Sequence, residues 1–104
     1  MKFDKSKKLL VIGRAGMDIY PEPPGTKISD VQEFSTHLGG SAANTCVALS
    51  KLGVSSDLVT CISDDAIGEY IFKKLEDFNV GSNLCRRVDK KFQTQVAVVE
   101  TILK

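Results

Sequence analysis

The sequence has 104 residues, a formal net charge of +1, 42% hydrophobic residues and 26% charged residues. This length and composition predict at most one globular domain with an ordinary hydrophobic core. The charge lacks the clustered basic excess of proteins that bind phosphate backbones, so we expect no nucleic acid partner.

The first half of the chain predicts a buried strand, a connector, a half-exposed strand and a helix. Residues 7–13, "KKLLVIG", form a short apolar run that is typical of a strand buried on both faces. Residues 20–30, "YPEPPGTKISD", hold all three prolines of the sequence and predict a turn or extended connector. Imperfect alternation over 27–38 predicts the half-exposed strand. A broad apolar face predicts a helix over 41–52, which Gly53 ends.

The second half predicts a strand, a helix and two further strands. The strands are expected at 55–63, at 84–88 and, as a long one, at 94–103. The helix between the first two has apolar residues at helical spacing, namely Ile67, Ile71, Leu75 and Phe78. On its opposite face, Glu69 and Lys73 are placed to form an ion pair across one turn. This order of elements is typical of an α/β sheet with crossover connections.

The number of expected elements indicates how well the sheet is covered. Three or four strands with two helices would leave one face of a doubly wound sheet poorly covered. We therefore expect residues 1–104 to be the N-terminal portion of a longer protein.

The cysteines and the N-terminal residues indicate the compartment. Cys46, Cys61 and Cys85 are far apart and form no C-x-x-C pair, so no metal site is predicted from them. They predict buried free thiols, which are typical of a reducing compartment and favour a cytoplasmic protein. The run "LLVIG" after the basic N-terminus is too short for a signal peptide or a membrane span, so no membrane partner is expected.

Two stretches that contain glycine are candidates for ligand binding. "GRAGMD" gives only G-x-x-G and leads into the proline-rich connector, so it lacks the third glycine and the helix of a dinucleotide site. "GGSAAN" opens a helix, whose free N–H groups can bind an anion or an oxygen-rich ligand. Gly39 and Gly40 would let a ligand approach the main chain, and Asn44 offers a donor and an acceptor, which suits a hydroxyl group. The alternative is a tight strand-to-helix turn with Asn44 solvated or bonded locally.

Asp18 lies just past the carboxyl end of the first expected strand, where ligands bind in open α/β sheets. Its carboxylate and the amide of Asn44, if they converge there, could bind vicinal hydroxyl groups. The alternative for Asp18 is an ordinary turn aspartate. His37, the single histidine, has no Ser or Cys partner pattern and is expected to be a satisfied or surface residue.

Four stretches of the sequence, in this order, resemble the amino-terminal third of the PfkB, or ribokinase-like, carbohydrate kinases. They are "VIGRAGMD", "EPPGTKI", "GGSAAN" with "LSKLG", and "SDDAIGEYIFKKLEDFNV", and together they span nearly the whole chain. The resemblance implies an α/β fold, namely the N-terminal part of a ribokinase-like sheet with helices packed on it and the β-strands of a small lid. The implied lid segments are about 17–38 and 92–102.

The resemblance also implies a function for the complete protein. It would be an ATP-dependent kinase, with Mg²⁺, that acts on a small-molecule sugar or sugar acid. Asp18, Gly39, Gly40 and Asn44 match positions that contact the sugar in this family. "GRAGMDIY" is similar to the branch that phosphorylates 5-dehydro-2-deoxygluconate in inositol breakdown. Arg14 within it would pair with a substrate carboxylate or, alternatively, is an exposed turn residue. A homodimer through the lid is a further implication.

The sequence departs from the family pattern at two positions and lacks one motif. Cys46 stands where a small Ser, Thr or Ala is usual. Ser63 stands where a glycine normally precedes the two aspartates, and it can serve there as a helix N-cap. The family's catalytic Asp, in a G-A-G-D motif near the carboxyl end, and the ATP-binding part are absent from these 104 residues. We therefore expect no catalytic residue and no kinase activity in this chain alone.

The sequence leaves two other functions open. One is a non-catalytic carbohydrate-binding or interaction module that keeps the sugar-side half of the fold. A G-A-G-D motif downstream of Lys104 would favour the kinase, and a stop codon there would favour the module. The other is a nucleotide-binding Rossmann domain, which the missing third glycine and the proline-rich connector disfavour.

Overall fold

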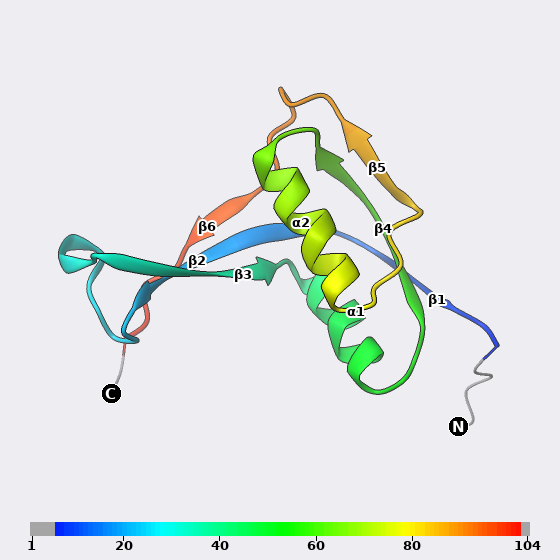
Figure 1. Cartoon of the computed structure of the whole chain (residues 1–104), viewed down its shortest axis with the longest axis horizontal. Coiled ribbons are helices and arrows are strands. Elements are labelled where there is room, and N and C mark those ends of the chain that lie inside the picture. The colour runs from blue at the N-terminus through cyan, green and yellow to red at the C-terminus, as the bar shows by residue number, and fades with distance from the viewer. Residues whose placement is uncertain (1–5, 103–104) are drawn as a thin grey trace.

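The computed structural model describes residues 6–102 and contains two three-stranded sheets and two α-helices (Figure 1). The elements in chain order are β1 (Leu9–Ile12), β2 (Gly16–Glu22), the 3₁₀-helix η1 (Ile28–Asp30), β3 (Glu33–Gly39), α1 (Ser41–Lys51), β4 (Ser56–Ser63), α2 (Ala66–Asp77), β5 (Cys85–Val88) and β6 (Val96–Val98). One sheet is parallel with the order β1-β4-β5, and the other has the order β3-β2-β6. We call the second one the projecting sheet, because it extends away from β1, β4 and β5 in Figure 1.

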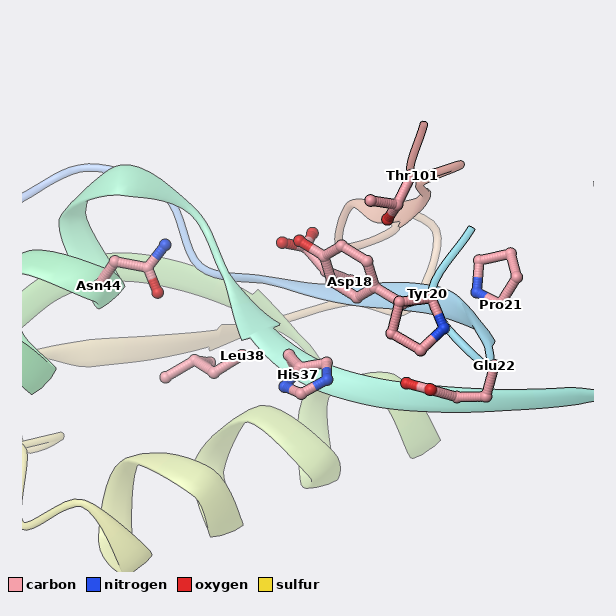
Figure 2. Close-up of a pocket in the computed structure, with 9 residues that line it drawn as sticks. Asp18, Tyr20, Pro21, Glu22, His37, Leu38, Asn44 and Thr101 are labelled. Atoms are coloured by element: carbon pink, nitrogen blue, oxygen red, sulfur yellow. The ribbon is translucent and has the colours of Figure 1, made fainter. Parts of the chain in front are cut away.

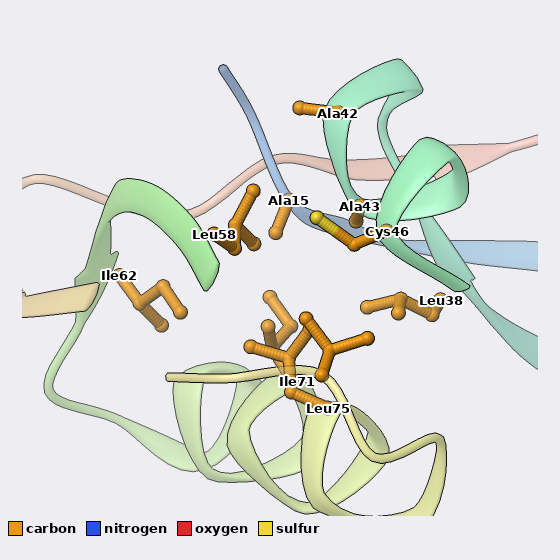
Figure 3. Close-up of a cluster of buried hydrophobic side chains, with 10 residues drawn as sticks. Ala15, Leu38, Ala42, Ala43, Cys46, Leu58, Ile62, Ile71 and Leu75 are labelled. Atoms are coloured by element: carbon orange, nitrogen blue, oxygen red, sulfur yellow. The ribbon is translucent and has the colours of Figure 1, made fainter. Parts of the chain in front are cut away.

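The parallel sheet and both helices share one hydrophobic core (Figure 3). Leu58 and Ile62 of β4 are fully buried there, together with Ile71 and Leu75 of α2. Helix α1 contributes small side chains, among them Cys46, so its axis can lie close to the sheet. The predicted burial of the Cys46 thiol is confirmed. The strand predicted over 55–63 and the helix predicted over 67–78 are confirmed in type.

The other face of the parallel sheet is open. Leu10 and Ile12 of β1 are 62% and 79% exposed, so the predicted burial of this strand on both faces is wrong within this chain. Cys61 of β4 is also exposed, and its predicted burial is wrong as well. Both corrections have one cause: the helices pack on the face that carries Leu58 and Ile62. For residues 6–102, the expectation of one poorly covered face is confirmed.

The projecting sheet is built around β2. Strand β3 pairs antiparallel with β2 from Gly16↔Gly39 to Glu22↔Glu33, and β6 pairs parallel with its first half. The connector predicted over 20–30 therefore begins later, at Pro23, because pairing with β3 holds the preceding residues extended. The three residues of β2 that pair with β6 precede Pro21. At Pro21 the β6 side of β2 is therefore unpaired, and the missing N–H of this proline removes no hydrogen bond from the sheet.

The other two predicted strands of this sheet are shorter in the structure. Instead of a strand over 27–38, η1 comes first and β3 begins at Glu33. The backbone N–H of Ile28 in η1 donates to Glu100 Oε1 at 2.8 Å, which ties this turn to the C-terminal segment. Of the long strand predicted over 94–103, residue 103 lies outside the described residues. Within 94–102 the strand is limited to β6, because three residues pair in register with β2, flanked by the hydrogen bonds of Gln95 and Val99 to β2.

The helix ends follow local signals. Helix α1 begins and ends within one residue of the prediction, and Gly53 leaves it with a φ of 80°, as its role of helix stop requires. Helix α2 is capped by Asp65, whose Oδ1 accepts a hydrogen bond from the N–H of Gly68 at 2.8 Å. The suggested N-cap role of Ser63 is therefore wrong. Among residues 6–102, no helix is long and apolar enough to cross a membrane.

Glu69 on α2 pairs with a different cation from the one predicted. Its carboxylate binds Arg87 of β5, where the sequence suggested Lys73 on the same helix. The guanidinium of Arg87 also lies 4.0 Å from the ring centroid of Phe72, so it packs over this side chain of α2.

Ser63 joins the end of β4 to the segment that leads into β6. It is fully buried, and its Oγ donates to Asp65 Oδ1 at 2.9 Å. Its backbone N–H donates to Thr94 Oγ1 at 2.9 Å, and the two hydroxyl oxygens lie 2.6 Å apart. Because the Ser63 proton is used by Asp65, the Thr94 hydroxyl donates to Ser63 Oγ. This network links the parallel sheet to the projecting sheet.

We expect Ser63→Ala to lower the stability of the protein by about 1–3 kcal/mol, because it leaves the part-buried N–H and hydroxyl group of Thr94 without the acceptor Ser63 Oγ. Thermal and urea unfolding of the protein measure the change. Ser55→Ala, at an exposed serine next to β4, is the matched control and should change stability by less than about 0.5 kcal/mol. Equal stability of the two variants would contradict this role for the network.

Candidate functional site

A pocket of about 490 Å³ lies against the projecting sheet, where β3 leads into α1 (Figure 2). Asp18, Tyr20 and Glu22 alternate along β2, so their side chains share one face of the sheet. His37 is the register partner of Asp18 on β3 and shares that face. The full lining is Asp18, Tyr20, Pro21, Glu22, Pro24, His37, Leu38, Asn44 and Thr101.

The two glycines before α1 are explained by what lies next to them. A Cβ on Gly39 would stand 2.6 Å from Cγ of Asp18, so any larger residue would displace that carboxylate. Gly40 has a φ of 96°, and a Cβ there would stand 2.9 Å from the carbonyl carbon of Arg14. The sequence suggested that these glycines make room for a ligand. In the structure they make room for Asp18 and for the main chain of Arg14.

Asn44 and Asp18 line the same pocket although they come from different elements. Gly40 is the N-cap of α1 and provides no side-chain cap, so first-turn N–H groups remain open to an oxygen-bearing ligand. Asn44 is an exposed residue of this first turn. In the view of Figure 2 Asp18 lies between Asn44 and Thr101. A carboxylate and an amide from the first turn of α1 therefore line one cavity, which is chemistry that suits hydroxyl groups.

Arg14 is not part of this arrangement. It is exposed and lines a second pocket, of about 240 Å³, with residues that include Cys61 and Thr94. The two pockets share no lining residue. Of the sequence-predicted site residues, Asp18, Gly39 and Asn44 come together, Gly40 shapes the turn beside them, and Arg14 lies apart.

Three polar residues, Glu22, Ser35 and His37, were not assigned to the site from the sequence. Ser35 Oγ donates to Glu22 Oε1 at 2.7 Å and lies 3.2 Å from His37 Nε2. The His37 ring meets the edge of the Tyr20 ring with centroids 5.2 Å apart. His37 is exposed with a hydrogen-bond partner, as predicted, but it also lines the pocket. The alternation of Asp18, Tyr20 and Glu22 could have revealed this face, had the prolines not indicated a connector.

The pocket does not suit the phosphates of ATP. Its charged lining residues among those described are Asp18 and Glu22, with no lysine or arginine, and two carboxylates repel a phosphate chain. Within residues 6–102, no group of three or more His, Cys, Asp or Glu side chains could hold a metal ion.

Burial, followed by the neighbouring Cys46, Asp57 and Cys61, raises the pKa of Cys85 to about 11, so this thiol stays protonated and inert.

Comparison with known proteins agrees with this geometry. Residues 6–102 match the family model described as pfkB family carbohydrate kinase. The chain belongs to this family. Its fold is the one expected from the resemblance: an α/β sheet of the ribokinase-like type with helices packed on it.

Several pfkB relatives match the chain in part. A 5-dehydro-2-deoxygluconokinase from Photobacterium profundum is 43% identical over 68 residues, which are 65% of this chain and 20% of that protein. A putative sugar kinase from Pyrococcus horikoshii is 35% identical over 80 residues, 77% of this chain and 26% of that protein. The chain thus spans no more than about a quarter of the length of these relatives.

Solved structures of pfkB kinases share the fold. The crystal structure of the Pyrococcus horikoshii sugar kinase has a TM-score of 0.77 at 32% identity, and the match covers 88% of this chain and 31% of that one. The fructokinase of Halothermothrix orenii has a TM-score of 0.74 at 26% identity over 90% of this chain and 34% of that one. A further structure of the Pyrococcus horikoshii kinase is a complex with ATP.

Proposed function

We propose that this chain is the sugar-side portion of a longer kinase, which transfers the γ-phosphate of ATP to a hydroxyl group of a sugar or sugar acid. The substrate is of the 5-dehydro-2-deoxygluconate type, as the name of the Photobacterium profundum relative suggests. The observation that carries the proposal is the single pocket in which Asp18, held against Gly39, and Asn44 at the start of α1 meet. Its polar groups accept and donate hydrogen bonds as a polyhydroxylated substrate requires.

Each site residue has a role in this proposal. Asp18 accepts hydrogen bonds from substrate hydroxyl groups, and Asn44 both donates and accepts. Gly39 and Gly40 set the approach of β3 and α1, which places Asp18 and Asn44 on one cavity. Arg14 pairs with the substrate carboxylate only if the substrate extends beyond the pocket toward the second one, where Arg14 lies.

The remaining catalytic parts belong, in this proposal, to chain beyond these residues. The two carboxylates of the pocket repel phosphate, so the phosphates of ATP, with the Mg²⁺ that they bring, are held elsewhere, together with the catalytic Asp. The projecting sheet, with segments 17–38 and 92–102, acts as a lid that closes over the sugar and excludes water. The three free cysteines support a reducing location, the cytoplasm.

The experiment is a coupled assay of ADP release by the full-length protein with ATP, Mg²⁺ and 5-dehydro-2-deoxygluconate, beside a panel of neutral sugars. We expect turnover with the sugar acid or with one of the sugars, and none from the 104-residue chain alone. Calorimetric binding of a sugar without any ATP turnover would contradict the kinase and support the non-catalytic module. Turnover by the isolated 104-residue chain would contradict the proposal that the catalytic Asp and the ATP site lie outside these residues.

We also propose a homodimer through the projecting sheet. The face opposite the pocket carries Ile19, Phe34 and Val98, which the β2 register places together, and the last two are 49% and 52% exposed. Phe34→Ser with Val98→Ser should convert the dimer to a monomer, because the apolar contact area is lost. Light scattering after gel filtration measures the mass. Leu52→Ser, at a residue 79% exposed after α1, is the control that should leave the mass unchanged. A monomeric unmodified protein would contradict the proposal.

A further inference from the structure

Three polar side chains on the pocket side of the projecting sheet form one hydrogen-bonded chain. Ser35 Oγ donates to Glu22 Oε1 at 2.7 Å and lies 3.2 Å from His37 Nε2. Ser35 and His37 alternate on β3, and β2 presents Glu22 on the same face. Glu22 and His37 both line the pocket, and Ser35 is half-buried between them.

The protons of this chain have one consistent arrangement. A serine hydroxyl has a single proton, and Ser35 gives it to the Glu22 carboxylate. The contact between Ser35 Oγ and His37 Nε2 is then a hydrogen bond only if Nε2 carries the proton and donates it. In a neutral imidazole this leaves Nδ1 as an acceptor. No bond to Nδ1 is formed by residues 6–102, so its lone pair is available.

The His37 ring is also held in place. It stands edge-on to the Tyr20 ring, with centroids 5.2 Å apart and an interplanar angle of 83°. Its register partner across the ladder is Asp18, so both side chains face the same cavity. An oriented acceptor therefore stands beside the carboxylate to which the proposed function assigns the substrate hydroxyls.

We propose that His37 is a substrate-binding residue whose Nδ1 accepts a hydrogen bond from a second hydroxyl group of the substrate, and that Glu22 and Ser35 are positioning residues that fix its tautomer. This inference rests on the proposed function and narrows its substrate. The substrate must present neutral hydroxyl groups to the projecting sheet, because Asp18 and Glu22 would repel a carboxylate there. The carboxylate of a sugar acid then points away from this sheet.

The test is steady-state kinetics of the full-length protein with ATP and 5-dehydro-2-deoxygluconate, or the panel sugar that the unmodified protein turns over. His37→Phe keeps a planar ring and removes the acceptor, and it should raise the substrate KM about 10-fold with kcat within about 2-fold. His37→Asn places an amide oxygen near the position of Nδ1 and should restore KM to within about 3-fold of the unmodified value. The KM for ATP should stay unchanged in both variants.

The positioning role has its own readout. Glu22→Gln lets the new amide donate to Ser35, which frees the serine proton for Nε2 and turns Nδ1 into a donor. We expect a raised substrate KM in Glu22→Gln alone and no further rise when it is added to His37→Phe. Glu33→Gln is the matched control, because Glu33 is the exposed register partner of Glu22 and does not line the pocket.

The outcomes separate this inference from the proposed function. If the unmodified protein turns over a substrate and His37→Phe keeps its KM, the proposed role of His37 is wrong and the kinase proposal stands. If the double variant shows a rise in KM equal to the product of the two single rises, Glu22 does not act by fixing the tautomer of His37. If the unmodified protein turns over no substrate with ATP, both proposals fall.

Discussion

Replacement of Asp18 by asparagine in the full-length protein is expected to lower kcat/KM for the sugar by about 100-fold. The carboxylate is the group in the pocket that lies against Gly39 and accepts hydrogen bonds from hydroxyl groups without offering any donor. A hydrogen bond to a charged partner is worth about 1.5–3 kcal/mol, and each 1.36 kcal/mol changes the rate tenfold. Two bonded hydroxyls therefore account for an effect of this size.

The asparagine variant separates chemistry from folding. Asn has the shape of Asp, so the contact with Gly39 persists and the melting temperature should remain close to that of the unmodified protein. Asp30→Asn, in the exposed turn η1, removes the same charge outside the pocket and should keep normal kinetics. Unchanged kcat/KM in Asp18→Asn, with a substrate turned over by the unmodified protein, would refute the role of this carboxylate.

The sequence predicted those features whose signals are local. Helix α1 was placed within one residue because its small apolar face is continuous and Gly53 adopts a positive φ after it. Helix α2 was found because its apolar residues recur at helical spacing over twelve residues, and strand β4 because it is a short apolar run. Asn44 was singled out because helix starts are where such side chains meet ligands. Asp18 was singled out as a residue just past a strand end, but it lies inside β2, paired with His37, and reaches the pocket from the face of the projecting sheet.

The projecting sheet could not be predicted in the same way. Its strands hold their extended form through pairing between residues distant in sequence, so Pro21 lies within β2 and β6 is only three residues long. The hydrogen-bonded chain of Glu22, Ser35 and His37 depends on that register, which no local pattern specifies. Burial was misjudged at Leu10 and Cys61 for a related reason: a strand pattern does not say which of its faces the helices of the chain cover.

The contact between Gly39 and Asp18 shows how the sheet and the site depend on each other. Gly39 lies in register with Gly16, and its missing Cβ leaves the space that the Asp18 carboxylate occupies. The same residue ends β3 just before α1 begins, so the position of Asp18 and the start of the helix are set together. A change at Gly39 therefore acts on the pocket through geometry and removes no chemical group.

Gly39→Ala is accordingly expected to lower kcat/KM by about 100-fold, although alanine takes part in no chemistry. The new Cβ would stand 2.6 Å from Asp18 Cγ, so the carboxylate must move, and a displacement of about 1 Å in a positioning group can cost about 100-fold. Gly53→Ala is the control for the effect of an added methyl group on stability. Its φ of 80° makes the methyl costly, yet its Cβ would meet nothing within 4 Å.

The two glycine variants should differ in kind. Gly53→Ala should lower the melting temperature and leave kinetics unchanged, whereas Gly39→Ala should lower both stability and kcat/KM. Adding Asp18→Ser, which shortens the displaced side chain, should recover stability in the Gly39→Ala background without recovering activity, because the clash is relieved and the carboxylate is gone. Suppose that Gly39→Ala loses activity while Gly39→Ala and Asp18→Ser lower stability additively when combined. The clash with Asp18 would then not be the cause of the lost activity.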